Sequence, residues 1–180
     1  MATESTSRFV IRPVSVEDYS GYVAVYQEAY SEPPWFEDWP ADEVLKMLDD
    51  SNKKDGYCCY GAFDDGRFRA ASLGFKMTLE ELTRKASSSS EDLARAGIVN
   101  EPVFYIGDVF VSRNFRRRKI GSALTMILLG HASVIGCKEV ILRTHRDLVA
   151  AHRLYSSCGF RELALADGTY PDRFYWQRLL

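Results

Sequence analysis

The stretch "YIGDVFVSRNFRRRKIGSAL" (105–124) contains, in order, an apolar run, a basic turn and the small-residue start of a helix. The apolar run, residues 103–111, has the nearly continuous hydrophobicity of a strand that is buried on both faces. Four consecutive cations, residues 116–119, follow it in a chain whose formal net charge is only -2. From Ile120 onward, apolar residues recur at helical spacing. The sequence therefore predicts a strand, a basic turn and a helix in direct succession.

The basic turn admits two interpretations. An isolated run of cations is most often a solvated surface, and such runs also mark nuclear-import or nucleic-acid patches. The chain has 23 basic and 25 acidic residues, however, so no further basic surface supports nucleic-acid binding. The first N–H groups of a helix lack intrahelical partners, and the helix dipole is positive at that end, which favours phosphate. Gly121 and Ser122 leave this helix start uncrowded, so we expect it to bind a phosphate-bearing ligand.

The patterns on either side of this stretch predict the order β-α-α-β-β-β-α-β-α-β-β. The expected strands are 8–14, 57–63, 68–77, 103–111, 138–144, 160–163 and 173–179, and the expected helices outside 79–102 are 19–30, 41–50, 120–135 and 148–158. The tetrapeptide "DDGR" (64–67) between two strands is a hairpin signal with Asp-Gly at its centre. This order is typical of an α/β domain whose helices pack on a mixed sheet.

Length and composition favour one ordinary globular domain over residues 1–180, because 180 residues can form a single sizeable core. Residues 1–7 read as a frayed tail. Residues 79–102 are polar and carry four consecutive serines, so we expect a helical arm with a mobile loop, inserted over an active-site edge or a partner surface. No stretch approaches the roughly 20 apolar residues of a membrane helix, and the start has no secretory apolar segment. The sequence thus predicts a cytoplasmic protein with no membrane partner.

The cysteines and histidines do not form a metal-ligand pattern. Adjacent Cys58 and Cys59 would point to opposite faces of a strand, and Cys137 and Cys158 are scattered. The chain has only three histidines and no CxxC or HxxxH pair. We therefore expect reduced, buried thiols and no metal.

Two motifs together carry a resemblance to a known family. The stretch 105–124 resembles the central motif of the GNAT acetyltransferase superfamily, a strand followed by R/Q-x-x-G-x-G/A and a helix. Independently, "AAHRLYSSCGF" (150–160) resembles the superfamily's A-x-x-L-Y-x-x-x-G-F helix and following strand. The resemblance implies a mixed, mostly antiparallel sheet of six to seven strands with helices on both faces. It also implies acetyl-CoA as the cosubstrate, held by its pyrophosphate at the basic turn.

The turn matches the family motif in two registers. One begins at Arg118 and satisfies the pattern literally with Gly121 and Ala123. The other begins at Arg116 and puts Lys119 in the place of the first glycine. We favour the second register, since the spacing from Val111 to Arg116 also matches the family. Lys119 then needs a negative φ or tolerates strain of about 1–2 kcal/mol.

The resemblance assigns cofactor-binding and catalytic roles. The expected cofactor-binding residues are Val109, Phe110 and Val111 on the strand and Arg116, Arg117, Arg118, Lys119, Ile120, Gly121 and Ser122 at the turn and helix start. Tyr155 matches the family tyrosine that protonates the departing thiolate, although helical spacing alone would favour a core tyrosine. Asp108 is the candidate base that takes a proton from the acceptor amine. A carboxylate in a buried strand could instead pair with an arginine or cap a loop.

The acceptor side is predicted from "EPPWFEDW" (32–39), where Trp35, Glu37 and Trp39 could hold a cationic amine by cation–π contact and charge. The alternative is a proline-fixed connector whose tryptophans cover the core. We expect acetyl transfer to a primary amine of a small molecule, such as a polyamine, an aminoglycoside or an amino-sugar-like amine. A protein or peptide N-acetyltransferase and a non-catalytic CoA-binding module are the alternatives, and a homodimer is left open.

Overall fold

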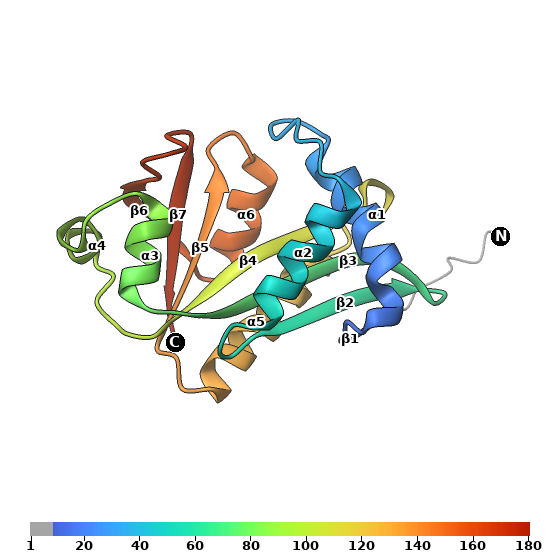
Figure 1. Cartoon of the computed structure of the whole chain (residues 1–180), viewed down its shortest axis with the longest axis horizontal. Coiled ribbons are helices and arrows are strands. Elements are labelled where there is room, and N and C mark those ends of the chain that lie inside the picture. Colours follow the sequence, from blue (N-terminus) through green and yellow to red (C-terminus); the bar gives the residue numbers. More distant parts are fainter. Residues whose placement is uncertain (1–8) are drawn as a thin grey trace.

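A computed structural model of the chain describes residues 9–180 and contains one seven-stranded sheet (Figure 1). The strand order is β1-β2-β3-β4-β5-β7-β6, and only the β4–β5 pair is parallel. The strands are β1 (Val10–Pro13), β2 (Cys58–Asp64), β3 (Arg67–Met77), β4 (Val103–Val111), β5 (Glu139–His145), β6 (Arg161–Ala166) and β7 (Arg173–Leu179). The mixed, mostly antiparallel sheet predicted from the resemblance is confirmed. The expected tail, 1–7, lies outside the described residues.

Helices cover both faces of this sheet, as predicted (Figure 1). The helices are α1 (Tyr19–Tyr30), α2 (Ala41–Asn52), α3 (Leu79–Ala86), α4 (Ser90–Ala96), α5 (Ile120–Val134) and α6 (Val149–Ser157), with 3-10 turns at Val16–Asp18 and Arg113–Phe115. Helices α1 to α4 share one face, where Phe75 packs against the clusters beneath both helix pairs. Helices α5 and α6 cover the other face. Across residues 9–180, none of the helices has the length and hydrophobicity to cross a bilayer.

The β2–β3 connection is the hairpin turn that the "DDGR" tetrapeptide predicts. Asp64 pairs with Arg67, so the loop consists of Asp65 and Gly66 alone. Both loop residues have positive φ, 48° and 72° respectively, as a type I′ turn requires.

Residues 79–102 contain a helix, α3, as expected of the helical arm, and a second helix, α4, where the serine content suggested a loop. The serines cap helices: Ser87 ends α3 in a left-handed conformation, and the Ser89 hydroxyl accepts a hydrogen bond from the backbone N–H of Asp92 to start α4. Both helices contribute fully buried leucines, Leu82 and Leu93, to a hydrophobic cluster against the sheet. The segment is therefore part of the core on the face shared with α1 and α2.

Two irregularities open the sheet beside the second half of β4. Parallel pairing of β4 with β5 ends at Ile106 and Leu142, although both strands continue. On its other side, β4 carries a bulge at Gly107, because Asp108 pairs with Leu73 while Ile106 pairs with the next residue of β3. From Asp108 onward, β4 is thus paired only with β3, and the edge that faces β5 is open.

Candidate active site

The basic turn adopts the strained conformation at Lys119. Lys119 is the residue that caps the start of α5, with φ 60° and ψ 12°, and Arg117 also has a positive φ of 65°. A left-handed non-glycine residue costs about 1–2 kcal/mol. This conformation is the one that a glycine adopts most readily, which fits the register in which Lys119 replaces the first glycine.

Arg116 is held by the protein itself. Its Nε donates to the carbonyl of Val111 at 3.0 Å, and its Nη1 lies 2.5 Å from a carboxylate oxygen of Glu32, which also pairs with Arg113. The other three cations of the turn, Arg117, Arg118 and Lys119, are exposed, and none has an ion pair within residues 9–180. These three cations are free to face a phosphate.

The first three residues of α5 differ in their burial and packing. Ile120 is buried, and Gly121 allows close packing against α6, since a Cβ there would lie 2.7 Å from Leu154 Cδ1. Ser122 is half-buried. Gly121 therefore brings α5 close to the helix that carries Tyr155.

The predicted cofactor-binding strand lies at the open edge of β4. Val109 packs with the cluster beneath α6, Phe110 is buried under α1, and Val111 packs against the start of α5. Because no strand pairs with this edge, backbone groups of these residues can accept an extended ligand as an added strand.

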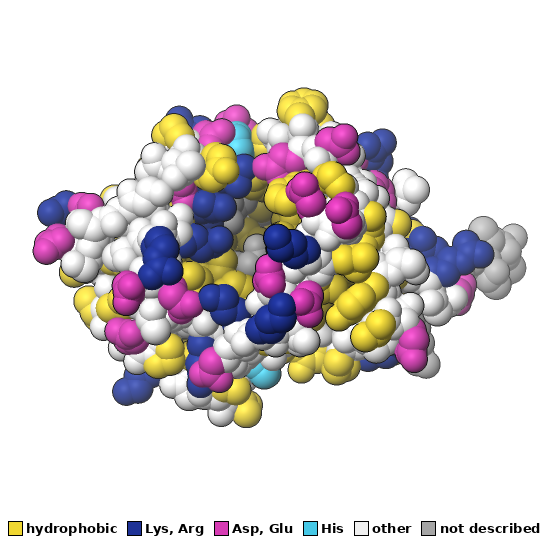
Figure 2. Space-filling model, viewed as in Figure 1, with side chains coloured by type: hydrophobic (Ala, Val, Ile, Leu, Met, Phe, Trp, Pro, Cys, Tyr) yellow, Lys and Arg dark blue, Asp and Glu magenta, His cyan; other side chains and the backbone are white. Residues whose placement is uncertain are grey.

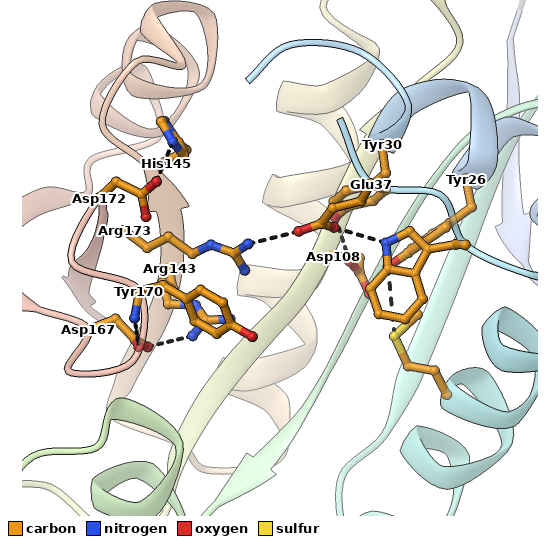
Figure 3. Close-up of polar contacts among 12 residues, drawn as sticks. Tyr26, Tyr30, Glu37, Asp108, Arg143, His145, Asp167, Tyr170, Asp172 and Arg173 are labelled. Atoms are coloured by element: carbon orange, nitrogen blue, oxygen red, sulfur yellow. Dashed lines mark hydrogen bonds and ion pairs between the residues drawn. The ribbon is translucent and has the colours of Figure 1, made fainter. Parts of the chain in front are cut away.

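Asp108 lies at the same opening and is hydrogen-bonded to Tyr30, whose hydroxyl donates to Oδ1 at 2.6 Å (Figure 3). Burial raises the pKa of Asp108 above its ordinary value, although the Tyr30 hydrogen bond and the charge of Lys85 oppose that rise. A carboxylate with a raised pKa is a stronger proton acceptor.

Tyr155 is buried in α6, with 7% of its surface exposed, beside Phe160 and Trp176. Burial raises the pKa of its phenol, and the nearby charge of Asp108 raises it further. Within the described part of the chain, the Tyr155 hydroxyl makes no hydrogen bond. The phenol is therefore protonated at neutral pH and free to donate to a bound molecule.

Glu37 lies across the cleft from Arg173 of β7 (Figure 3), and Trp35 and Trp39 contact this pair. Glu37 accepts from the Trp39 indole at 2.9 Å and from Arg173 Nη2 at 2.8 Å. Arg173 also stacks on Trp35, with Cζ 4.9 Å from the ring centroid. The positions where a cationic amine was expected are thus occupied by a cation of the protein, Arg173.

A hollow opens between the α1–α2 side of the molecule and the side formed by α3, β5 and β7, and Lys and Arg side chains gather along it (Figure 2). Arg143 of β5 pairs with the buried Asp167, and His145 lies further along the same strand (Figure 3). The Nδ1 of His145 accepts from the backbone N–H of Asp147, which leaves Nε2–H to donate to Asp172. Both ring nitrogens of His145 are thereby used in hydrogen bonds.

Sequence patterns missed Tyr30, Lys85, Arg143 and Arg173. Tyr30 belongs to an aromatic stripe at helical spacing, which is equally typical of a core. The other three residues are ordinary surface cations in the sequence. The available signal was a cation inside an apolar strand, as Arg143 is in "KEVILRT".

The comparisons with known proteins agree with this fold. Residues 22–160 match the model of the acetyltransferase (GNAT) family. The chain therefore belongs to the acetyltransferase (GNAT) family.

The individual proteins that the chain resembles share limited sequence identity with it. N-alpha-acetyltransferase 30 of Dictyostelium discoideum is 37% identical over 59 residues, which are 33% of this chain and 32% of that protein. The match thus spans about a third of the curated relative. The ribosomal-protein-alanine N-acetyltransferase of Brucella melitensis superposes with a TM-score of 0.71 at 18% identity, covering 95% of this chain and 99% of that one. The PaiA N-acetyltransferase of Thermoplasma acidophilum, solved with coenzyme A, has a TM-score of 0.68 at 16% identity, covering 96% and 99%.

The strained turn yields a stability prediction. Lys119→Gly removes the left-handed strain and is expected to stabilise the protein by about 1 kcal/mol. For a chain of this size, thermal unfolding should shift upward by about 2–4 °C. The matched control is Arg118→Gly, since Arg118 has no positive φ and glycine there only adds freedom to the unfolded chain. A fall in melting temperature for Lys119→Gly as large as that of the control would contradict the strain.

Proposed function

We propose that the protein transfers the acetyl group of acetyl-CoA to the primary amine of a small-molecule acceptor, by direct attack in a ternary complex. The observation that carries the proposal of a small acceptor is the Glu37–Arg173 ion pair, which crosses the cleft (Figure 3). It joins the α1–α2 connection to β7, and Trp35 adds a second contact to His145, with ring centroids 5.7 Å apart. A bridged cleft suits a compact molecule better than a polypeptide running through it.

The donor side is supported by the open strand edge and the turn. Arg117, Arg118 and Lys119 and the free N–H groups at the start of α5 are suited to the pyrophosphate of acetyl-CoA. Arg116 has a supporting role, because it fixes the turn to β4 and to Glu32. The backbone of β4 from Val109 to Val111 offers hydrogen bonds to the extended arm.

The transfer itself needs one base and one acid. Acetyl-CoA supplies the acetyl group as a thioester. Asp108 takes a proton from the acceptor ammonium, because only the neutral amine attacks the thioester carbon. As the new C–N bond forms and the C–S bond breaks, Tyr155 donates its proton to the departing thiolate. The resulting tyrosinate recovers a proton from the new amide nitrogen, which loses its second proton, and Asp108 releases the proton that it took to solvent, so the site returns to its starting state.

A protein or peptide N-acetyltransferase is the second candidate. The 59-residue match to an N-alpha-acetyltransferase favours it. Thiol release from acetyl-CoA, measured with a panel of small amines and of short peptides with free N-termini, separates the two. Higher kcat/KM for the small amines supports the first candidate, and higher kcat/KM for the peptides supports the second. The absence of thiol release with every acceptor would leave only a CoA-binding module.

The bridge across the cleft yields a specificity prediction. Glu37→Gln weakens the ion pair with Arg173, so the cleft should open and accept larger molecules. We expect kcat/KM for a short peptide, divided by that for a small amine, to rise severalfold. Asp49→Asn on the exposed side of α2 is the charge-matched control. An unchanged ratio in Glu37→Gln would show that the bridge does not limit acceptor size.

A further inference from the structure

Three cations from separate elements lie close enough for their charges to interact: Lys85 of α3, Arg143 of β5 and Arg173 of β7. Arg143 and Arg173 lie on the side of the cleft opposite Glu37 (Figure 3). We refer to them as the cationic wall. Arg143 and Arg173 flank the ring of Tyr170, with Cζ atoms 5.5 Å and 4.2 Å from its centroid. Lys85 Nζ lies 5.0 Å from the ring centroid of Tyr105 on β4.

The carboxylates of the protein leave one cation of this wall without an ion pair. Asp167 is fully buried and already accepts hydrogen bonds from Arg143, the Tyr175 hydroxyl and two backbone N–H groups. Both oxygens of Glu37 are also taken, one by Arg173 and one by Trp39. Lys85 has no ion pair within residues 9–180. Arg143 and Arg173 therefore each have an ion pair and Lys85 has none, while the remaining carboxylate of the cleft, Asp108, is hydrogen-bonded to Tyr30.

Unused hydrogen-bond donors point to the same conclusion. The Nε of Arg173 is buried and has no hydrogen-bond partner in the described chain. A buried donor without a partner lowers stability, and more so when the group is charged. Desolvation of the ammonium and the charge of Arg143 together lower the pKa of Lys85, although the residue is exposed. A negatively charged ligand group at the wall would give the Nε of Arg173 a hydrogen-bond acceptor and would raise the pKa of Lys85.

The wall lies at a suitable distance from the catalytic carboxylate. Tyr105, over which Lys85 lies, precedes Asp108 by three residues on β4, so about 10 Å of strand separates them. Both side chains belong to the α1–α4 face, because Tyr105 packs under α3 and Asp108 bonds to α1. A molecule a few bonds long can place an amine at Asp108 and a negative group at the wall.

We propose that the acceptor is a primary amine that also bears a carboxylate, and that Lys85, Arg143 and Arg173 bind this carboxylate. The inference rests on the proposed function and narrows its substrate class to amino acids, including ω-amino acids, of modest length. The preference is opposite to that expected for a polyamine, whose second cation the wall would repel.

Matched acceptors test the inference. For ω-amino acids of four to six carbons, kcat/KM is compared with that of the carboxamide of each acid and of the diamine of equal length. We expect kcat/KM for each ω-amino acid to be at least 10-fold higher than for its carboxamide. The difference from the diamine should be larger still. Lys85→Gln should bring the carboxylate-to-carboxamide ratio close to one, mainly through a higher KM for the carboxylate. Arg84→Gln, the neighbouring exposed cation of α3, is the control and should keep the ratio.

Each outcome decides between the proposals. Equal or better turnover of carboxamides or diamines would overturn this inference and leave the small-amine function in place. A preference for carboxylates that Lys85→Gln does not change would overturn the role of the wall. If no small amine is acetylated while peptides are, the proposed function fails and this inference fails with it. In that case the N-acetylated ω-amino acid, added with CoA, should also leave the melting temperature unchanged.

Discussion

Tyr155→Phe is expected to lower kcat by about 100-fold or more, the usual range for removing a positioned acid. Phenylalanine keeps the ring that packs against Phe160 and Trp176, so the fold should be preserved. The raised pKa of Tyr155 keeps it protonated through neutral pH, and its hydroxyl has no hydrogen bond within residues 9–180 whose loss would disturb the site. The defect should therefore appear in the chemical step alone.

Two measurements separate that outcome from a structural defect. The Kd for CoA, measured by titration calorimetry, should stay within about twofold of the wild-type value. Tyr60→Phe removes a half-buried phenol from β2, which is two strands away from β4 in the sheet, and should keep full turnover. Wild-type kcat in Tyr155→Phe would exclude this phenol as the acid.

Asp108→Asn is expected to lower kcat/KM by about 100- to 10,000-fold at neutral pH, because the acceptor arrives as an ammonium ion. The loss should shrink at high pH, where the neutral amine is abundant and needs no base. A loss that stays constant up to the pKa of the acceptor would argue against proton removal by Asp108.

The direction in which kcat/KM changes with pH can be checked. Since burial raises the pKa of Asp108, wild-type kcat/KM should fall as pH falls through this raised value. Tyr30→Phe removes a hydrogen bond that favours the charged carboxylate, so the pKa should rise further and the acidic limb should move to higher pH. A limb that does not move would show that Tyr30 does not act through Asp108.

Stability gives an independent readout of the same group. The native state holds the proton of Asp108 more tightly than the unfolded chain, so the free energy of unfolding decreases as pH rises through the raised pKa. Asp108→Asn removes this penalty. Its melting temperature at neutral pH is therefore expected to be equal to or above that of the wild type, while its activity is lost.

Local patterns were sufficient for most of the fold. Strand β4 and helix α5 were predicted from their apolar patterns, and the turn between them from its run of cations. The β2–β3 hairpin was predicted from its Asp-Gly pair. Each of these elements depends on neighbouring residues. The prediction of a loop at the serine run missed helix α4 for an equally local reason. Serine caps helices as readily as it fills loops, and composition cannot distinguish the two roles.

The site was predictable only where a motif covered it. Tyr155 and Asp108 were selected through the family resemblance, and their roles remain predictions. The partner of Asp108 is 78 residues away, at Tyr30, and Arg173 is 136 residues from Glu37. Periodicity contains no information about such pairs. The stripe of Tyr22, Tyr26 and Tyr30 looks uniform in the sequence, yet only its last member reaches the carboxylate.

The bulge at Gly107 acts as a phase shift along β4. Ahead of it, Phe104 and Ile106 face α5 and α6, so strict alternation would send Asp108 and Phe110 to that same side. Instead Asp108 bonds to α1, Phe110 lies under α1, and Val109 and Val111 take the positions toward α5 and α6. If Gly107 took a regular place in the ladder, the carboxylate would lie on the far side of the sheet, away from the Tyr30 hydroxyl. The bulge accommodates one extra residue and thereby keeps Asp108 on the face of the sheet that α1 covers.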